Sequence, residues 1–249
     1  MTRIPIGWKT YSQPQYWEFE QDAHLMLVCD EPELRSRLLY EYANHVTGRS
    51  CMRLLFAAAA SIPPQSDKIF DATANPGEWE KSRSVFRWLR DENTRRLSSP
   101  RPMLLQPILV VFDGLEDYAQ HTQIGLATLM RVANDGWNTN IHLLATATSD
   151  PVRQSAFLNT PGVEQLTDRS AMLIVHNANA GFAYYEQSNH SPMAIRIPEV
   201  DDFQPVQPEY AHAKLKLPEQ PNLLLDHEPP VVRSLFSDEK KQNPDSQGR

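Results

Sequence analysis

Two short segments of the sequence carry side chains that could together hold a nucleotide and a divalent cation. Arg35 and Ser36 lie shortly after an apolar run at 24–28, and Asp113 directly follows a second apolar run at 107–112. In nucleoside triphosphate sites a cationic side chain meets the phosphates, a hydroxyl binds Mg²⁺, and an Asp at the end of a neighbouring strand helps to hold the metal. The pattern therefore nominates Arg35, Ser36 and Asp113 as cofactor-binding residues.

The register of the first segment fits the phosphate-binding pattern G-x-x-x-x-G-K-S, but most of the residue types differ. Cys29 takes the place of the first glycine, Leu34 that of the last glycine, and Arg35 that of the lysine. Ser36 alone of these four keeps the expected type. Glycine adopts positive φ without strain, whereas cysteine and leucine do not. A loop that folds its N–H groups around phosphates is therefore not expected here.

The residues between these positions also oppose phosphate. Pro32 has no N–H to donate. Glu31 and Glu33 place two carboxylates where a triphosphate would lie. At an effective dielectric of about 20, one like-charge contact at about 4 Å costs on the order of 4 kcal/mol. We expect no catalytic residue in this segment, no required cofactor, and at most weak binding of ATP with Mg²⁺.

Apolar runs alternate with helical patterns along the chain. The expected strands are 24–28, 107–112, 140–147 and 171–176, the expected helices are 33–46, 81–97 and 124–133, and the run at 52–59 is ambiguous. Continuous apolar strands separated by helices predict an α/β fold, with a mostly parallel sheet covered on both faces. The aromatic opening segment predicts short N-terminal β structure.

Several further landmarks occur in order between residues 4 and 200. They are Ile4-Pro5-Ile6-Gly7, His24-Leu25, Trp88-Leu89 with Glu92 and Arg95-Arg96, the stretch 110–117, the stretch 140–146, and Gly162 to Leu166 with Arg169 and Met172-Leu173. This order resembles the FtsK/SpoIIIE family of ring motors, which includes DNA translocases and the tandem ATPase domains of type VII secretion. The resemblance implies a P-loop NTPase-like fold. It also implies homologous ATPase subunits, or secretion or translocation machinery, as partners.

The departures from the family fall where its chemistry lies. Gly114 stands in place of the Glu that activates water, Trp137 in place of an arginine, Ala147 and Thr148 in place of Gln-Arg, and Asp168, Ser170 and Ala171 break a G-R-G-D pattern. Glu116 and Asp117 carry carboxylates close to Gly114, but they lie two and three positions after it, so their side chains are not expected to point to the same place. Losing one water-orienting or charge-stabilising group commonly costs about 10²-fold in rate. These departures predict a catalytically degenerate domain.

Composition limits the setting. The 249 residues allow one large α/β domain with extensions or two small domains, and the net charge of −7 provides no global basic field for nucleic acid. The two cysteines suit a reducing cytoplasmic compartment. No apolar run approaches the roughly 20 residues of a membrane-spanning helix, so we expect no direct membrane insertion. The eight histidines show no zinc spacing, so no metal site is expected.

Proline and polar residues mark the end of the expected domain. We predict a folded domain at 1–204 and a Pro-rich, disordered tail at 205–249. The tail contains two apolar islands, 223–225 and 231–236. Such islands dock on partners or pack back onto their own domain, and the sequence leaves both alternatives open.

The leading hypothesis is a pseudo-ATPase that acts as a structural or regulatory subunit of a motor or secretion-type assembly. This hypothesis allows the chain to form an oligomer. One alternative is an ATP-hydrolysing DNA translocase whose unconventional loop uses Arg35, Ser36, Asp113 and Glu116. Another is a nucleic-acid-binding module built on the basic stretch 81–101, with DNA as the partner. Acidic residues interleave with this stretch, which favours an ordinary solvated helix face.

Overall fold

The computed structural model describes residues 3–10, 13–46, 51–57, 69–75, 78–115, 123–148, 163–177, 181–187 and 190–198. All of these belong to one unit of the chain, Met1–Leu217. The second unit, Pro218–Arg249, lies outside the described residues. The whole of the predicted tail, 205–249, with its apolar islands, also lies outside the described residues, and the domain boundary at residue 204 stays a prediction.

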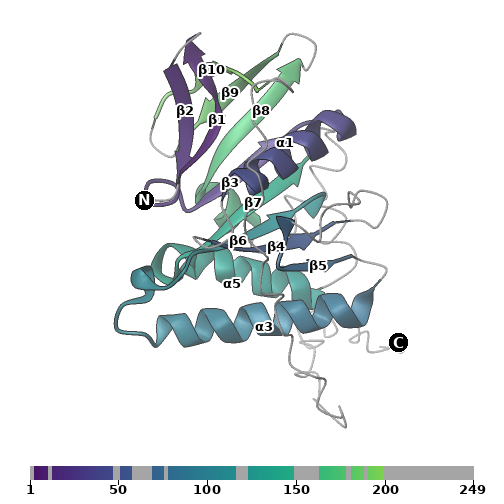
Figure 1. The fold of residues 1–249 in the computed structure, drawn as a ribbon, viewed down its shortest axis with the longest axis vertical. Coiled ribbons are helices and arrows are strands. Elements are labelled where there is room, and N and C mark those ends of the chain that lie inside the picture. The colour runs from purple at the N-terminus through teal and green to yellow at the C-terminus, as the bar shows by residue number, and fades with distance from the viewer. Residues whose placement is uncertain are drawn as a thin grey trace, which may run out of the picture. The chain divides into compact units, whose positions relative to one another are not determined.

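Six strands form the parallel half of one ten-stranded sheet (Figure 1). In spatial order they are β5 (Ala72–Ala74), β4 (Met52–Phe56), β6 (Ile108–Phe112), β7 (Ile141–Ala147), β3 (His24–Val28) and β8 (Ser170–Asn177). Every residue of β3, β6 and β7 is buried, because helices lie against both faces of these strands. This burial accounts for their continuous apolar sequences. The four strands expected from such runs are confirmed, and the ambiguous run contains β4.

Four antiparallel strands continue the same sheet beyond β8. They are β9 (Phe182–Glu186), β10 (Met193–Arg196), β1 (Arg3–Thr10) and β2 (Gln13–Glu18), in that order. The predicted N-terminal β structure is thus confirmed, and it pairs with strand β10 from the other end of the described chain. The sequence reading missed β5, β9 and β10.

Helices cover both faces of the parallel half, as expected. Helix α1 (Pro32–His45) packs on one face, and α3 (Trp79–Leu97) and α5 (Gln123–Thr139) pack on the other (Figure 1). Short helices α7 (Val163–Asp168) and η2 (Pro102–Leu104) complete the described helical elements. The three long helices confirm the predicted ones. No described helix is long and apolar enough to cross a membrane.

Helix α5 continues beyond residue 133, where its predicted end lay, because tertiary contacts hold its last turns. Asn93 of α3 donates a hydrogen bond to Asp135 at 2.9 Å. Gly136 packs so closely that a Cβ atom at this position would clash with the Ile141 carbonyl oxygen and would lie 2.7 Å from His24 Cε1. Glycine thus serves close packing at this position, although it has a low helix propensity.

His24 is a fully buried histidine at the start of β3. Its Nδ1 accepts a hydrogen bond from the Leu143 N–H at 3.0 Å, so its Nε2 carries the proton and donates to the Ala133 carbonyl at 3.0 Å. Burial lowers the pKa of His24 to about 4. The ring is therefore neutral and joins β3, β7 and α5. Within the described residues, no group of His, Cys, Asp and Glu has the arrangement of a metal site.

Candidate functional site

The three predicted cofactor-binding residues meet at the edge of the sheet where β3 and β6 end. Ser36 Oγ on α1 donates a hydrogen bond to Asp113 Oδ2 at 3.1 Å. Arg35 Nε, also on α1, lies 3.3 Å from Asp113 Oδ1. Asp113 directly follows β6. In open α/β sheets this carboxyl edge is where ligands bind, so the topology brings the three side chains to a suitable place.

The carboxylate of Asp113 already has partners within the chain. Besides Ser36 and Arg35, Thr146 near the end of β7 donates from Oγ1 to Asp113 Oδ1 at 3.1 Å. The same Thr146 oxygen accepts the Gly114 N–H at 2.7 Å. The side chain of Asp113 is only 1% exposed. Protein groups therefore contact both carboxylate oxygens, in a place that water scarcely reaches.

Thr146 is the residue of this site that sequence reasoning missed. It lies one residue before the end of β7, which is the neighbour of both β3 and β6 in the sheet. The available signal was its hydroxyl, because parallel neighbouring strands bring their last residues to one edge. Sequence reasoning assigned Thr146 to the strand at 140–147 and considered only the next two residues, Ala147 and Thr148, as positions of the site.

Arg35 supplies the positive charge for Asp113. Its side chain is 16% exposed, so the pair lies mostly out of water. A buried carboxylate requires such compensation, because an unpaired buried charge is strongly destabilising. A Mg²⁺ ion at this place would have to compete with the Arg35 guanidinium for the Asp113 carboxylate.

Helix α1 begins within the segment that the G-x-x-x-x-G-K-S register assigns to a phosphate-binding loop. Strand β3 ends at Val28 and α1 begins at Pro32, so three residues connect them. Glu31 is the N-cap, and the Arg35 N–H donates to its carbonyl at 2.9 Å. Residues 32–34, which the G-x-x-x-x-G-K-S pattern assigns to the loop, therefore form the first helical turn. A short connection of this kind cannot surround a phosphate with N–H groups.

Contacts across the sheet edge hold the connecting segment in place. Asp30 Oδ1 accepts a hydrogen bond from Thr148 Oγ1 at 2.8 Å, and the Cys29 N–H donates to the Ala147 carbonyl at 3.1 Å. Burial raises the pKa of the Cys29 thiol, which keeps it in the unreactive protonated form. Thr148, which stands where the resemblance expects arginine, thus holds the end of β7 to the segment after β3.

The other departures from the family pattern fall in several places. Gly114 has φ of 77°, a left-handed conformation suited to glycine. Trp137 on α5 is 47% exposed. Ser170 is buried and donates to the Leu166 carbonyl. Glu116 and Asp117 lie outside the described residues, so their role as substitutes for the missing Glu stays untested.

The basic stretch 81–101 contains a structural arginine. Arg96 is 4% exposed and donates to the carbonyls of Thr139, Asn140 and Gln106 at 3.0, 3.2 and 2.8 Å. It also pairs with Glu92 at 2.7 Å. Arg96 therefore cannot belong to a nucleic-acid surface, which corrects its inclusion there. Three other cations of the stretch pair with acidic residues at its exposed face: Lys81 with Glu78, Arg90 with Asp91, and Arg95 with Glu92.

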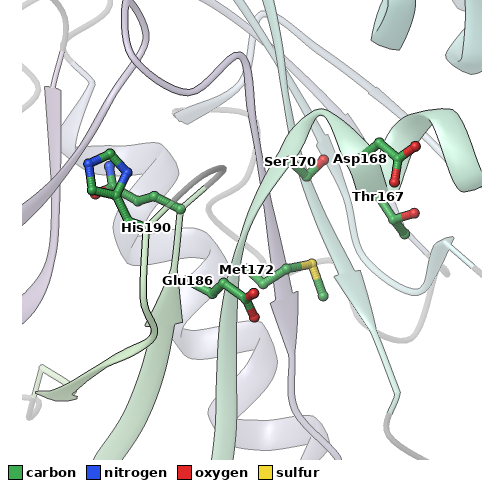
Figure 2. A pocket seen from close by; sticks show the side chains of 7 residues that line it. Thr167, Asp168, Ser170, Met172, Glu186 and His190 are labelled. Carbon is green, nitrogen blue, oxygen red and sulfur yellow. The ribbon is translucent and has the colours of Figure 1, made fainter.

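A separate pocket of about 590 Å³ lies at the opposite edge of the sheet, where β8 begins and β9 ends (Figure 2). Its lining residues are Thr167, Asp168, Ser170, Met172, Glu186, Gln187 and His190. Asp168 and Glu186 make this pocket acidic. None of the predicted cofactor-binding residues lines it.

Solved ATPase structures share this fold. EccC of Thermomonospora curvata (ATPases 2 and 3, in complex with a signal sequence peptide) matches with a TM-score of 0.64 and 18% identity, over 79% of this chain and 40% of that one. EssC of Geobacillus thermodenitrificans (ATPases 2 and 3) matches with a TM-score of 0.59 and 12% identity, over 81% and 46%. The conjugation coupling protein TcpA of pCW3, solved with ATPγS, matches with a TM-score of 0.60 and 12% identity, over 78% and 65%.

No protein-family model matches the sequence, and no curated protein sequence matches it significantly. The chain spans less than half the length of the EccC and EssC structures. Identities this low establish the fold alone. The chain has the FtsK/SpoIIIE-like P-loop ATPase fold, which confirms the fold expected from the resemblance.

Proposed function

We propose that this chain is a catalytically degenerate FtsK/SpoIIIE-like domain, a pseudo-ATPase, that serves as a structural or regulatory subunit of a cytoplasmic motor or secretion-type assembly. One observation carries the proposal. The buried Asp113 carboxylate is neutralised by Arg35 and hydrogen-bonded by Ser36 and Thr146, all from the same chain. The group that would help hold a metal is engaged internally.

Three local features oppose hydrolysis of ATP. Mg²⁺ would have to displace the Arg35 guanidinium from a mostly buried carboxylate. Phosphate would have to approach α1 at Pro32, which lacks an N–H, and beside Glu31 and Glu33, which are exposed. Gly114 has no side chain with which to orient water. Losing one such catalytic contact commonly costs about 10²-fold in rate, so we expect little or no hydrolysis of ATP by this chain.

An assembly role agrees with the proteins that share the fold. Their names describe a type VII secretion ATPase and a conjugation coupling protein, and two of the structures hold consecutive ATPase domains. A domain that no longer hydrolyses ATP can still complete an interface with a neighbour of the same fold. We therefore propose homologous ATPase domains, or the secretion or translocation machinery they serve, as partners.

The test of the nucleotide site is equilibrium binding of a fluorescent ATP analogue to the full chain with Mg²⁺, followed by competition with unlabelled ATP. We expect no competable binding up to millimolar nucleotide. Asp113→Ala serves as the matched variant, because it removes the residue on which any metal-dependent site here would depend. Micromolar binding that Asp113→Ala abolishes would refute the pseudo-ATPase proposal. DNA-stimulated hydrolysis by the wild-type chain would then support the DNA-translocase alternative.

The test of the assembly role is co-purification of the tagged full chain from its native host. We expect a stable complex that contains a homologous ATPase subunit. A chain that elutes alone, in a host with no homologous ATPase encoded nearby, would leave the subunit role without support. This outcome is independent of the nucleotide measurement, because a partner interface does not require ATP binding.

A further inference from the structure

One face of the antiparallel half of the sheet has no described helix over it. On β8, Met172 and Ile174 face the side on which α3 and α5 pack, and both are partly buried. Tyr184 of β9 lies opposite Ile174, and Ala194 of β10 lies opposite Tyr184. Directly paired residues point to the same side of a sheet. The side that α3 and α5 cover therefore continues across β9 and β10, where Figure 1 shows no helix.

This continuation exposes aromatic side chains. Phe182 is 56% exposed and Tyr184 is 49% exposed, whereas the alternate residues of β9 are buried. Phe182 lies opposite Arg196, whose guanidinium lies 4.5 Å from the ring centroid of Trp8. We call this surface the outer face and define it by Trp8, Met172, Ile174, Phe182, Tyr184, Ala194 and Arg196. Exposed apolar patches rimmed by polar residues mark interaction sites.

The outer face ends at the acidic pocket. Glu186 of β9 lies opposite Met172, and both line the pocket, as Figure 2 shows. Asp168 lines the same pocket from the end of α7. A ligand that lies along the outer face thus meets aromatic rings first and two carboxylates at the pocket. This order of chemistry fits an extended segment with apolar side chains and cations.

We propose that residues 210–217 of the same chain, YAHAKLKL, dock on the outer face. This segment contains no acidic residue, whereas 199–209 contains four. Leu215 and Leu217 alternate with Lys214 and Lys216, which are the first two lysines or arginines after Arg196. In an extended conformation the leucines face one side, and the flexible lysine side chains reach the carboxylates at the edge. The leucines therefore complement the aromatic side chains of the outer face, and the lysines complement the carboxylates of Asp168 and Glu186 in the pocket.

The connection to this segment is long enough. The described chain ends beside the outer face, where the Ile197 N–H donates to the Gly181 carbonyl at 2.9 Å, next to the start of β9. The link from residue 198 to residue 215 can span up to roughly 56 Å when extended, and the four-residue step from Phe182 to Glu186 covers about 13 Å. A tether of this length gives an effective concentration near the millimolar range. Even a weak contact is therefore populated.

Thiol protection in the full chain tests the proposal. Ala194→Cys places a thiol at an exposed position of the outer face, and the native thiols of Cys29 and Cys51 are buried. We expect maleimide to label this cysteine about tenfold more slowly than it does when Leu215→Ser and Leu217→Ser are added, which corresponds to a Kd near 0.1 mM at a millimolar effective concentration. Lys214→Glu with Lys216→Glu should raise the rate in the same direction.

The control is Leu104→Cys on η2, at a position that is 76% exposed and outside the outer face. Its labelling rate should not change with the tail substitutions. In a second measurement, Ala194→Cys combined with Leu217→Cys should form an intramolecular disulfide under mild oxidation, and Leu104→Cys with Leu217→Cys should not. Labelling at Ala194→Cys that is indifferent to the tail substitutions would overturn the proposal. Protection that grows with protein concentration would overturn it in favour of a second copy as the occupant.

Discussion

Separating Arg35 from Asp113 should destabilise the fold far more than separating an exposed pair of similar geometry. Arg35 Nε lies 3.3 Å from Asp113 Oδ1, and the side chains are 16% and 1% exposed. At an effective dielectric of 20, the attraction at this distance is about 5 kcal/mol, most of which desolvation offsets. We therefore expect a double-mutant cycle of Arg35→Met and Asp113→Asn to give a coupling energy of about 1–3 kcal/mol.

Urea unfolding of the four proteins, followed by circular dichroism, measures this coupling. The matched control is the cycle of Arg90→Met and Asp91→Asn, whose charged atoms lie 3.0 Å apart on side chains that are 50% and 68% exposed. That pair should couple by less than about 0.5 kcal/mol, because water screens it. Equal coupling in the two cycles would refute the argument that burial makes Arg35 the internal counter-ion of Asp113. The candidate site would then be electrostatically open to an external cation.

Three further predictions concern stability and use the same unfolding assay. Gly136→Ala should lower the free energy of unfolding by about 2–4 kcal/mol, although alanine normally favours helices. Gly181→Ala, at φ of 66° with open space around it, should lower it by only about 1 kcal/mol. A Gly136→Ala variant that is more stable than the wild type would contradict the close packing at residue 136. Arg96→Met should lower the free energy of unfolding by about 3–5 kcal/mol and Arg95→Met by less than about 1 kcal/mol, because only Arg96 is buried. Similar losses in the two variants would show that burial does not determine the contribution of these arginines to stability. Burial lowers the pKa of His24 from 6.5 to about 4, so between these pH values the unfolded chain binds a proton at His24 and the folded chain does not. The free energy of unfolding should therefore fall by about 1.4 kcal/mol per pH unit from about pH 6.5 down to about pH 4. His24→Gln should remove this part of the pH dependence, and an unchanged slope would contradict a neutral buried ring.

Much of the parallel half was predictable because burial on both faces requires unbroken apolar strands. Strand β5, Ala-Thr-Ala, is three residues long and half-buried, so it carries no such signal. Strand β9 alternates exposed and buried residues, but its exposed positions include aromatic side chains, which obscure the polar–apolar alternation. The end of α5 was not predicted because glycine has a low helix propensity, and only the close packing of Gly136 against Ile141 and His24 explains its place.

The candidate site was predictable in its members more than in its arrangement. Topology alone brings Ser36 and Asp113 to one edge, because each lies beyond the carboxyl end of a parallel strand. The helix expected at 33–46 agrees with the start of α1 at Pro32 to within one residue, and proline favours the first position of a helix. The motif register, which assigned 32–34 to a phosphate-binding loop, was the part that conflicted with this helix. The pairing of Arg35 with Asp113, rather than with phosphate, depends on side-chain geometry that no spacing rule contains.

The pairing of β1 with β10 has a consequence for how the chain reaches its native state. Residues 3–10 are synthesised long before their neighbour in the sheet, at 193–196, which lies near the end of the described residues. Until then β1 and β2 form a hairpin with one open edge, and isolated hairpins are marginally stable in water. Contacts this distant in sequence slow folding. Completion of the antiparallel half should therefore be the slow, late step of folding, and a nascent chain shorter than about residue 196 should expose the β1 edge to other strands.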